Sequence, residues 1–186
     1  MRGPFCVEGH AIVSEDGMIA DSTGLMPNAL KFESDQKLYE QALDRATILA
    51  NGRLSYEWQA NSPRRLRLVL TRRVAGLAPD PSNPNARLWN PAGASLEAAC
   101  AALGVDAGLI AVIGGPFVFS LFLGIGYDAF HLSHAPGVRL PRGAPVFREQ
   151  EPGRSPEEVL LAAGLKAGPA RRLEDGVTIV EWTRAG

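Results

Sequence analysis

The chain has 186 residues, of which 46% are hydrophobic and 21% charged, and its net charge is −1 with an isoelectric point near 6.3. This length suffices for one sizeable core and is short for two, so we expect a single domain over residues 1–186. The near-zero charge excludes a global field that attracts nucleic acid or membrane, and the chain shows neither a leader nor a membrane-spanning apolar run, which predicts a cytoplasmic protein.

Strands and helices alternate in the first half of the chain. The elements expected there are a strand at 5–13, a turn at 14–17, a loop at 21–29, a helix ending near Arg45, a short strand at 47–50, a brief helix at 54–58 and a strand at 66–70. Ser34 or Asp35 is the expected N-cap of the first helix. Glu8, on the first strand, is interpreted as an outward-facing charge.

The alternation continues in the second half. The elements expected there are a loop at 75–86, a strand at 86–89, a helix from Ser95 to Leu103, a strand at 109–113, a helix at 117–123, a strand at 127–133, a helix at 155–165 and a strand at 177–182. Such an order predicts an α/β fold with a mostly parallel sheet and helices on both faces. Ligands of these sheets bind beyond the carboxyl ends of the strands.

Three of the expected strand ends carry residues suited to phosphate. Gly114-Gly115 precedes a helix that can begin at Pro116, and glycines there allow a pyrophosphate to approach the helix N-terminus. The stretch 51–55 (NGRLS) and the stretch 71–73 (TRR) add guanidinium and hydroxyl groups. Each also has a purely structural interpretation, as a packing turn or as solvated charge. Together they favour one phosphorylated dinucleotide, and the arginines favour NADPH over NADH.

The sequence resembles the dihydrofolate-reductase-like superfamily. The segments that carry the resemblance are SEDGMIA (14–20), ATILANGRLSYEW (46–58), RLVLTRR (67–73) and IAVIGGPFVFSLFL (110–123). With YDAFHLSHAPGVRLPRGAPVF (127–147), the chain is most similar to the reductase domain of the bifunctional riboflavin-biosynthesis deaminase/reductase. The resemblance implies a mostly parallel central sheet with a C-terminal antiparallel edge, an NADPH groove and a possible homodimer.

The resemblance also implies which residues hold NADPH. The adenosine-side phosphates would be held by Gly52, Arg53 and Ser55, and the adenine with its 2′-phosphate would be flanked by Thr71 and Arg72. The pyrophosphate and nicotinamide side would be contacted by Ile113, Gly114, Gly115, Phe117 and Val118. The nicotinamide ring would lie near Ala11 and Ile12. The loop at 20–27 would correspond to the mobile loop that covers the reacting rings.

The chain departs from true dihydrofolate reductases at two positions. The carboxylate that supports protonation of the pterin aligns with Ala29, while Glu33 and Asp35 lie further along the helix. Phe119 takes the place of an aromatic hydroxyl. The catalytic residue therefore stays unassigned, with Asp35, Glu33 and Ser133 as candidates.

A substrate with a phosphate and a uracil-like ring requires a basic group and polar partners. The candidates for these contacts are Asn28, Lys31, His131 and Ser133, and alternation puts the last two on one face of their strand. The two cysteines, Cys6 and Cys100, form no disulfide framework, and no His, Cys or carboxylate pair has metal spacing, so no metal is expected.

The sequence predicts an NADPH-dependent reductase that transfers hydride to a small pyrimidine or pteridine-type molecule, as in the reduction of 5-amino-6-ribosylaminouracil phosphate. Two alternatives stay open. The first is a genuine dihydrofolate reductase whose carboxylate is displaced to Asp35 or Glu33. The second is a regulatory module that binds NADPH without turnover.

Overall fold

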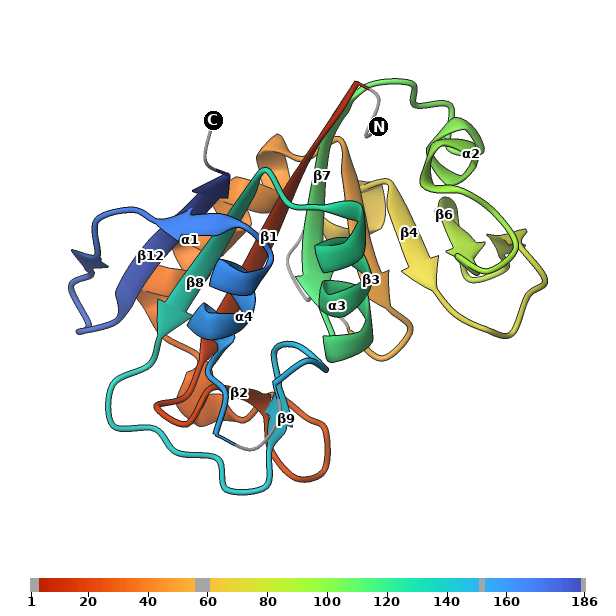
Figure 1. Ribbon diagram of the computed structural model, residues 1–186. Coiled ribbons are helices and arrows are strands. Elements are labelled where there is room, and N and C mark those ends of the chain that lie inside the picture. The colour runs from red at the N-terminus through yellow and green to blue at the C-terminus, as the bar shows by residue number, and fades with distance from the viewer. Residues whose placement is uncertain (1–3, 56–60, 151–152, 185–186) are drawn as a thin grey trace.

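The computed structural model describes residues 4–55, 61–150 and 153–184 (Figure 1). Its main strands are β1 (Phe5–Val13), β3 (Ile48–Gly52), β4 (Arg67–Leu70), β5 (Leu77–Asp80), β6 (Asn83–Trp89), β7 (Gly108–Gly114), β8 (Ala129–His134), β10 (Leu165–Ala167), β11 (Arg171–Arg172) and β12 (Thr178–Arg184). Over the described residues these form one ten-stranded sheet of order β10-β12-β8-β1-β7-β3-β4-β6-β5, with β11 paired to β12. Two further strands, β2 (Met18–Ala20) and β9 (Ala144–Pro145), pair separately.

The six central strands of the sheet, from β8 to β6, are all parallel. At the C-terminal edge, β12 runs antiparallel to β8, and β10 and β11 run antiparallel to β12. The predicted fold class is therefore confirmed: an α/β sheet, mostly parallel, with an antiparallel C-terminal edge.

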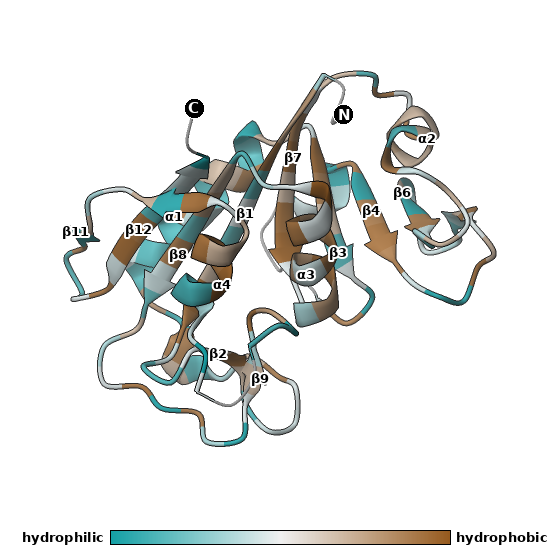
Figure 2. Ribbon diagram, viewed as in Figure 1, coloured by the Kyte–Doolittle hydropathy of each residue, from teal (hydrophilic) through white to brown (hydrophobic). Residues whose placement is uncertain are grey.

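Helices cover both faces of the sheet, which explains why its central strands are apolar on both sides. Figure 1 shows α1 (Glu33–Arg45) behind the sheet, and α3 (Pro116–Ile125) and α4 (Pro156–Ala162) in front of it. In Figure 2, β7 and β4 are coloured hydrophobic over most of their length. Leu43 of α1 packs on Leu49 and Ala111 behind the sheet, whereas Phe122 of α3 and Leu160 of α4 belong to the main core. The remaining helices are α2 (Leu96–Ala101) and the 3₁₀ turns η1 (Asn28–Leu30) and η2 (Ser62–Arg64).

The loop predicted over residues 75–86 is wrong, because this stretch forms most of the antiparallel β5–β6 hairpin. Pro79 is tolerated since β5 is the edge strand, Pro81 lies in the turn, and Pro84 precedes the part of β6 that pairs with β4. The turn is closed by Asp80, whose carboxylate accepts hydrogen bonds from the backbone and hydroxyl of Ser82.

The predicted N-cap of the first long helix is also wrong. The N-cap residue is Phe32, which has no polar side chain. A carboxylate from the distant β11–β12 connection, Asp175, instead accepts hydrogen bonds from the backbone N–H and the hydroxyl of Ser34. A cap supplied 141 residues later in the chain leaves no local sequence signal.

The helix predicted at 155–165 ends earlier. It begins with a capping box between Ser155 and Glu158, and it ends at Ala162. Gly164 then has a φ of 85°, which helical residues do not adopt, and Leu165 starts β10. The predicted helix at 54–58 falls largely on residues 56–60, which lie outside the described part of the chain.

The two cysteines occupy contrasting environments and form no disulfide with each other. Cys6 is exposed on β1, whereas Cys100 is buried in α2, where burial raises the pKa of its thiol to about 11. Among the described helices none is long and apolar enough to cross a membrane.

Candidate active site

The three predicted phosphate-binding strand ends lie side by side. They terminate β7, β3 and β4, which are consecutive in the sheet and parallel (Figure 1). Asn51 is paired with Gly114, and Gly52 with Leu70, so residues 52–55, 71–73 and 114–118 follow at one edge of the sheet. The structure thus brings together residues that are more than 60 positions apart in the sequence.

Hydrogen bonds join the first two of these ends. The Ser55 hydroxyl accepts a 3.0 Å hydrogen bond from the backbone N–H of Gly115. The Asn51 side-chain amide donates to the carbonyl oxygens of Gly52 and Ser55, at 3.0 and 3.1 Å. Gly115 is the N-cap of α3 and Pro116 occupies the first turn, as predicted. The connection after β3 is therefore held against the N-terminus of α3.

The two glycines at the end of β7 have different physical causes. Gly114 has a φ of 112°, and a Cβ there would lie 3.1 Å from the ring of Phe119, so the fold itself requires glycine. At Gly115, in contrast, only the Ser55 hydroxyl of the described residues lies within 4 Å of the position a Cβ would take, at 3.7 Å. Gly52 makes only ordinary contacts of 3.5 Å or more. Internal packing does not explain these last two glycines.

The side chains at these strand ends are of two kinds, polar accessible ones and apolar ones. Arg53 and Arg72 are exposed, and Thr71 is half-buried with its hydroxyl accepting from the backbone N–H of Arg73. Phe117 is 44% exposed at the start of α3. Val118 is buried in the main core, and Ile113 is half-buried against the cluster of Leu43 and Ala111.

A cavity of about 170 Å³ lies between α1 and the sheet. It is lined by residues of α1, β1, β8, β11 and β12: His10, Ala11, Asp35, Leu38, Tyr39, Ala42, Arg45, His131, Ser133, Arg171 and Ile179. Ala11, expected near the nicotinamide ring, is part of this wall, whereas its neighbour Ile12 is buried in a small apolar cluster with Leu30 and Val177.

Asp35 reaches this cavity from the first turn of α1. Its carboxyl group is hydrogen-bonded to the hydroxyl of Ser133, which is buried on β8. Burial, reinforced by the negative charge of Asp175, raises the pKa of Asp35 in spite of the hydrogen bond from Ser133. A buried carboxyl of raised pKa can hold and deliver a proton. Glu33, two residues earlier, is exposed and does not line the cavity.

The predicted substrate contacts divide into two groups. His131 and Ser133 both line the cavity and share one face of β8, as predicted. Asn28 and Lys31 do not line it; they are exposed and joined to each other by a 2.8 Å hydrogen bond. The basic groups of the wall are instead Arg45 and Arg171. Arg45 closes the expected helix and Arg171 lies in the segment least similar to the family, so neither carried a signal.

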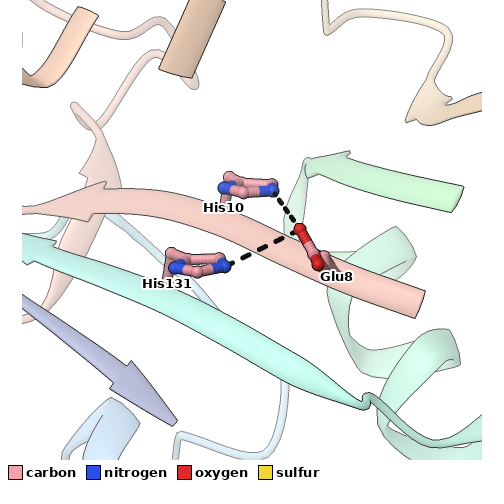
Figure 3. A group of neighbouring side chains, drawn as sticks. All are labelled: Glu8, His10 and His131. Carbon is pink, nitrogen blue, oxygen red and sulfur yellow. Dashed lines mark ion pairs between the residues drawn. The ribbon is translucent and has the colours of Figure 1, made fainter. Parts of the chain in front are cut away.

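Glu8 is not an outward-facing charge. Its carboxylate lies beside the edges of the His10 and His131 rings, and one oxygen is 3.7 Å from the Nε2 atom of each (Figure 3). The two rings are stacked, with centroids 4.7 Å apart. Contacts with His10 and then His131 hold the pKa of Glu8 well below its usual range, against burial, while burial lowers the pKa of His10. The sequence signal was present as Glu-x-His on a strand, since alternate residues share a face.

Carboxylates fix the turn after β1 and the loop at 20–27. Asp21 accepts hydrogen bonds from the backbone and hydroxyl of Thr23 and from the backbone of Leu25, which shapes the loop expected to cover the reacting rings. Asp16 accepts from Ser14 and from the backbone of Leu140. Leu25 is 67% exposed, so this loop presents an accessible apolar side chain.

A second, larger cavity of about 480 Å³ lies at the β1–β2 turn and the N-terminus of α4. Its wall contains an ion pair between His134 and Glu157, whose Nε2 and Oε1 atoms are 2.9 Å apart. Burial raises the pKa of Glu157, but the bonds from His134, its own backbone and Ser155 outweigh burial and lower that pKa to about 2.

Comparison with known proteins identifies the fold. No protein-family model and no curated sequence matches this chain. Among solved structures, a protein assigned to riboflavin biosynthesis from Shewanella sp. PV-4 is similar with a TM-score of 0.65 at 19% identity, covering 97% of this chain and 99% of that one. A pyrimidine reductase-like protein from Corynebacterium diphtheriae is similar with a TM-score of 0.63 at 14% identity, covering 97% and 92%.

Two further similar structures are a riboflavin-type deaminase/reductase and a dihydrofolate reductase, the two kinds of enzyme with which the sequence was compared. The deaminase/5-amino-6-(5-phosphoribosylamino)uracil reductase of Thermotoga maritima has a TM-score of 0.61 at 18% identity; the match covers 97% of this chain and 56% of that longer one. Dihydrofolate reductase of Enterococcus faecalis, complexed with NADP(H), has a TM-score of 0.60 at 16% identity and covers 97% of both chains. The chain has the dihydrofolate-reductase-like fold.

Proposed function

We propose that this protein is an NADPH-dependent reductase of a phosphorylated pyrimidine or a related heterocycle, in which Asp35 supplies the proton. The observation that carries the proposal is the half-buried Asp35 carboxyl, bonded to Ser133 in a cavity that Ala11 also lines. The solved structures with this fold include a deaminase/uracil reductase and a dihydrofolate reductase in complex with NADP(H).

The cofactor assignment rests on the strand ends. Gly52 and Gly115 leave open the backbone surface that a pyrophosphate would cover, and Arg53 and Arg72 offer guanidinium groups for further phosphates. When bound, the dihydronicotinamide of NADPH would supply a hydride.

The residues of the cavity have separable roles. Asp35, whose pKa is raised by burial, donates a proton to a ring nitrogen or a sugar oxygen of the substrate, and Ser133 fixes the orientation of its carboxyl group. Arg45 and Arg171 attract an anionic substituent such as a phosphate. Leu38, Tyr39 and Ile179 provide an apolar surface that excludes water from the reacting groups.

Titration of the purified protein with NADPH and with NADH tests the cofactor assignment. We expect tighter binding of NADPH, and replacement of either Arg53 or Arg72 by alanine weakens it about 10-fold or more, since each removes a charge-assisted contact. Arg154→Ala, an exposed arginine at the second cavity, is the matched control and leaves the affinity unchanged. Absence of binding of either nucleotide at near-millimolar concentration would falsify the proposal.

Dihydrofolate is a second candidate substrate, favoured by the presence of Asp35 in the cavity. The position of the carboxylate in dihydrofolate reductases aligns with Ala29 in this sequence, which argued against folate as the substrate. The Asp35 carboxyl reaches the cavity from the first turn of α1 and removes that objection. Following NADPH oxidation with the ribosylaminopyrimidine phosphate and, separately, with dihydrofolate distinguishes the two. Tight NADPH binding without turnover of either would favour the non-catalytic alternative.

A further inference from the structure

We propose that Glu8, His10 and His131 form a binding site for one divalent first-row transition-metal ion, of which Zn²⁺ is the natural probe, in the wall of the α1 cavity. One carboxylate oxygen and two imidazole nitrogens lie within 4.8 Å of one another. Two imidazoles with one carboxylate make a donor set that suits Zn²⁺ and its neighbours better than Mg²⁺ or Ca²⁺.

The sheet builds this group from two strands. Glu8 and His10 are alternate residues of β1 and share its α1 face, and the parallel register of β1 with β8 sets His131 directly opposite His10 (Figure 3). The backbone positions of all three donors are therefore fixed by ladder hydrogen bonds, as a preorganised site requires.

The distances between the donors fit a shared ion. The carboxylate oxygen of Glu8 is 3.7 Å from each Nε2 atom, beyond hydrogen-bonding distance. With metal–ligand bonds of about 2.1 Å, this separation corresponds to an angle of about 120° at the metal, near the tetrahedral range. The two rings are stacked nearly parallel, so their nitrogen lone pairs meet at one ion only when a ring tilts, and the more exposed ring, His131, is the one free to do so.

Burial supplies the independent observation. His10 is 8% exposed, and its Nε2 atom has no hydrogen-bond partner among the described residues. The facing oxygen of Glu8 is likewise buried without a hydrogen bond. Buried polar atoms without hydrogen bonds cost free energy, and a carboxylate oxygen that faces an imidazole nitrogen across 3.7 Å is the arrangement that a bound cation satisfies.

The charges around the group set its selectivity. Arg45 of α1 lies near His10 and opposes any cation, whereas Glu181 of β12 is paired in register with His131 and adds a negative charge on the same face. With one carboxylate in direct contact, binding must come mainly from the nitrogen donors. Because His10 and His131 both line the cavity, a remaining coordination position is within reach of a substrate oxygen.

Titration of the chelator-treated, full-length protein with Zn²⁺, in competition with a chromogenic chelator, tests the proposal without NADPH or substrate. We expect one equivalent to bind, and Glu8→Gln and His131→Asn each to weaken binding at least 10-fold. Co²⁺ in place of Zn²⁺ is expected to give the visible absorption of a four-coordinate nitrogen and oxygen site, and both variants lose it.

His134→Ala is the matched control, because His134 lies on the same strand but pairs with Glu157. It must retain the wild-type affinity. Substoichiometric or undetectable binding at micromolar Zn²⁺, or equal affinity in wild type and His131→Asn when circular dichroism shows both to be folded, overturns the proposal. Since NADPH binding is measured separately, neither outcome affects the proposed reductase function.

Discussion

At the residue scale, Asp35 stands out because its position works against the stability of the fold. A carboxyl group whose pKa is raised in the folded state stabilises the protein fully only below its unfolded-state pKa, and this contribution is lost as the pH rises through the folded-state value. The ionised form, present at higher pH, is penalised by burial and by the negative charge of Asp175. A proton donor held at a thermodynamic disadvantage is typical of a functional group.

Asp35→Asn is therefore expected to separate activity from stability. Turnover falls about 100-fold or more because the proton donor is lost. The melting temperature at neutral pH rises, and the difference from wild type disappears below the ordinary pKa of an aspartic acid. Activity assays and thermal scans over a pH series check both effects. Glu33→Gln, an exposed change on the same helix turn, is the control; if it matches Asp35→Asn, the assignment fails.

Glu157 behaves in the opposite sense. Its pKa is lowered to about 2 from an ordinary value of 4.5, so its stabilising contribution is present above pH 4.5 and is lost as the pH falls toward 2. Glu157→Gln is expected to lower the melting temperature at neutral pH, with the difference from wild type shrinking through that window. A difference independent of pH would show that the carboxylate charge is not responsible.

At the element scale, one hydrogen bond connects β3 to α3. Ser55→Ala removes the acceptor for the N–H of Gly115 and is expected to destabilise the fold by about 1 kcal/mol. Loss of this hydrogen bond also loosens the turn at Gly114-Gly115. We therefore expect the affinity for NADPH to fall by more than the loss of folding stability alone would cause. Chemical denaturation and nucleotide titration of the same variant measure the two. Ser82→Ala, in the β5–β6 turn, is a control that leaves NADPH binding intact.

The elements differ in how far the sequence could predict them. Buried parallel strands such as β3 and β7 are continuous apolar runs ended by glycine, and both were recognisable. The β5–β6 hairpin was missed because prolines read as loop, although an edge strand accepts them. The start of α1 was misjudged because Asp175, far along the chain, supplies its cap.

The candidate site also has some features that the sequence could predict and others that it could not. The position of the three strand ends at one edge of the sheet was predictable, because the carboxyl ends of parallel strands share one edge. The partnership of Glu8 with His131 was not, because it depends on β8 being the neighbour of β1, a pairing between segments more than 100 residues apart. The position of Arg171 in the wall of the α1 cavity was not predictable either, because it depends on the pairing of β11 with β12.

At the scale of the whole molecule, one core cluster extends from Leu68 on β4 to Trp182 on β12, across nearly the full width of the sheet. Trp89 on β6 and Trp182 on β12 are both buried and belong to opposite halves of the sheet. Because they share a core, we expect the described sheet to unfold in one cooperative transition.

Two single-tryptophan proteins test this expectation. One retains Trp89 and the other Trp182, with the remaining tryptophans, including Trp58, replaced by phenylalanine. Because each variant has its own stability, its fluorescence transition is compared with its own circular-dichroism transition in denaturant, and we expect the two to coincide. Separate midpoints for the two probes would show that the C-terminal edge unfolds independently.

The unequal environments of the two cysteines have a practical consequence. Cys100 is buried and its raised pKa keeps it in the unreactive thiol form, whereas Cys6 is exposed. A thiol-reactive fluorophore applied to the native protein should therefore attach to Cys6 alone. Because Cys6, Glu8 and His10 alternate along β1, the dye would sit on the strand face that carries the histidine pair, as a built-in reporter of events in the cavity.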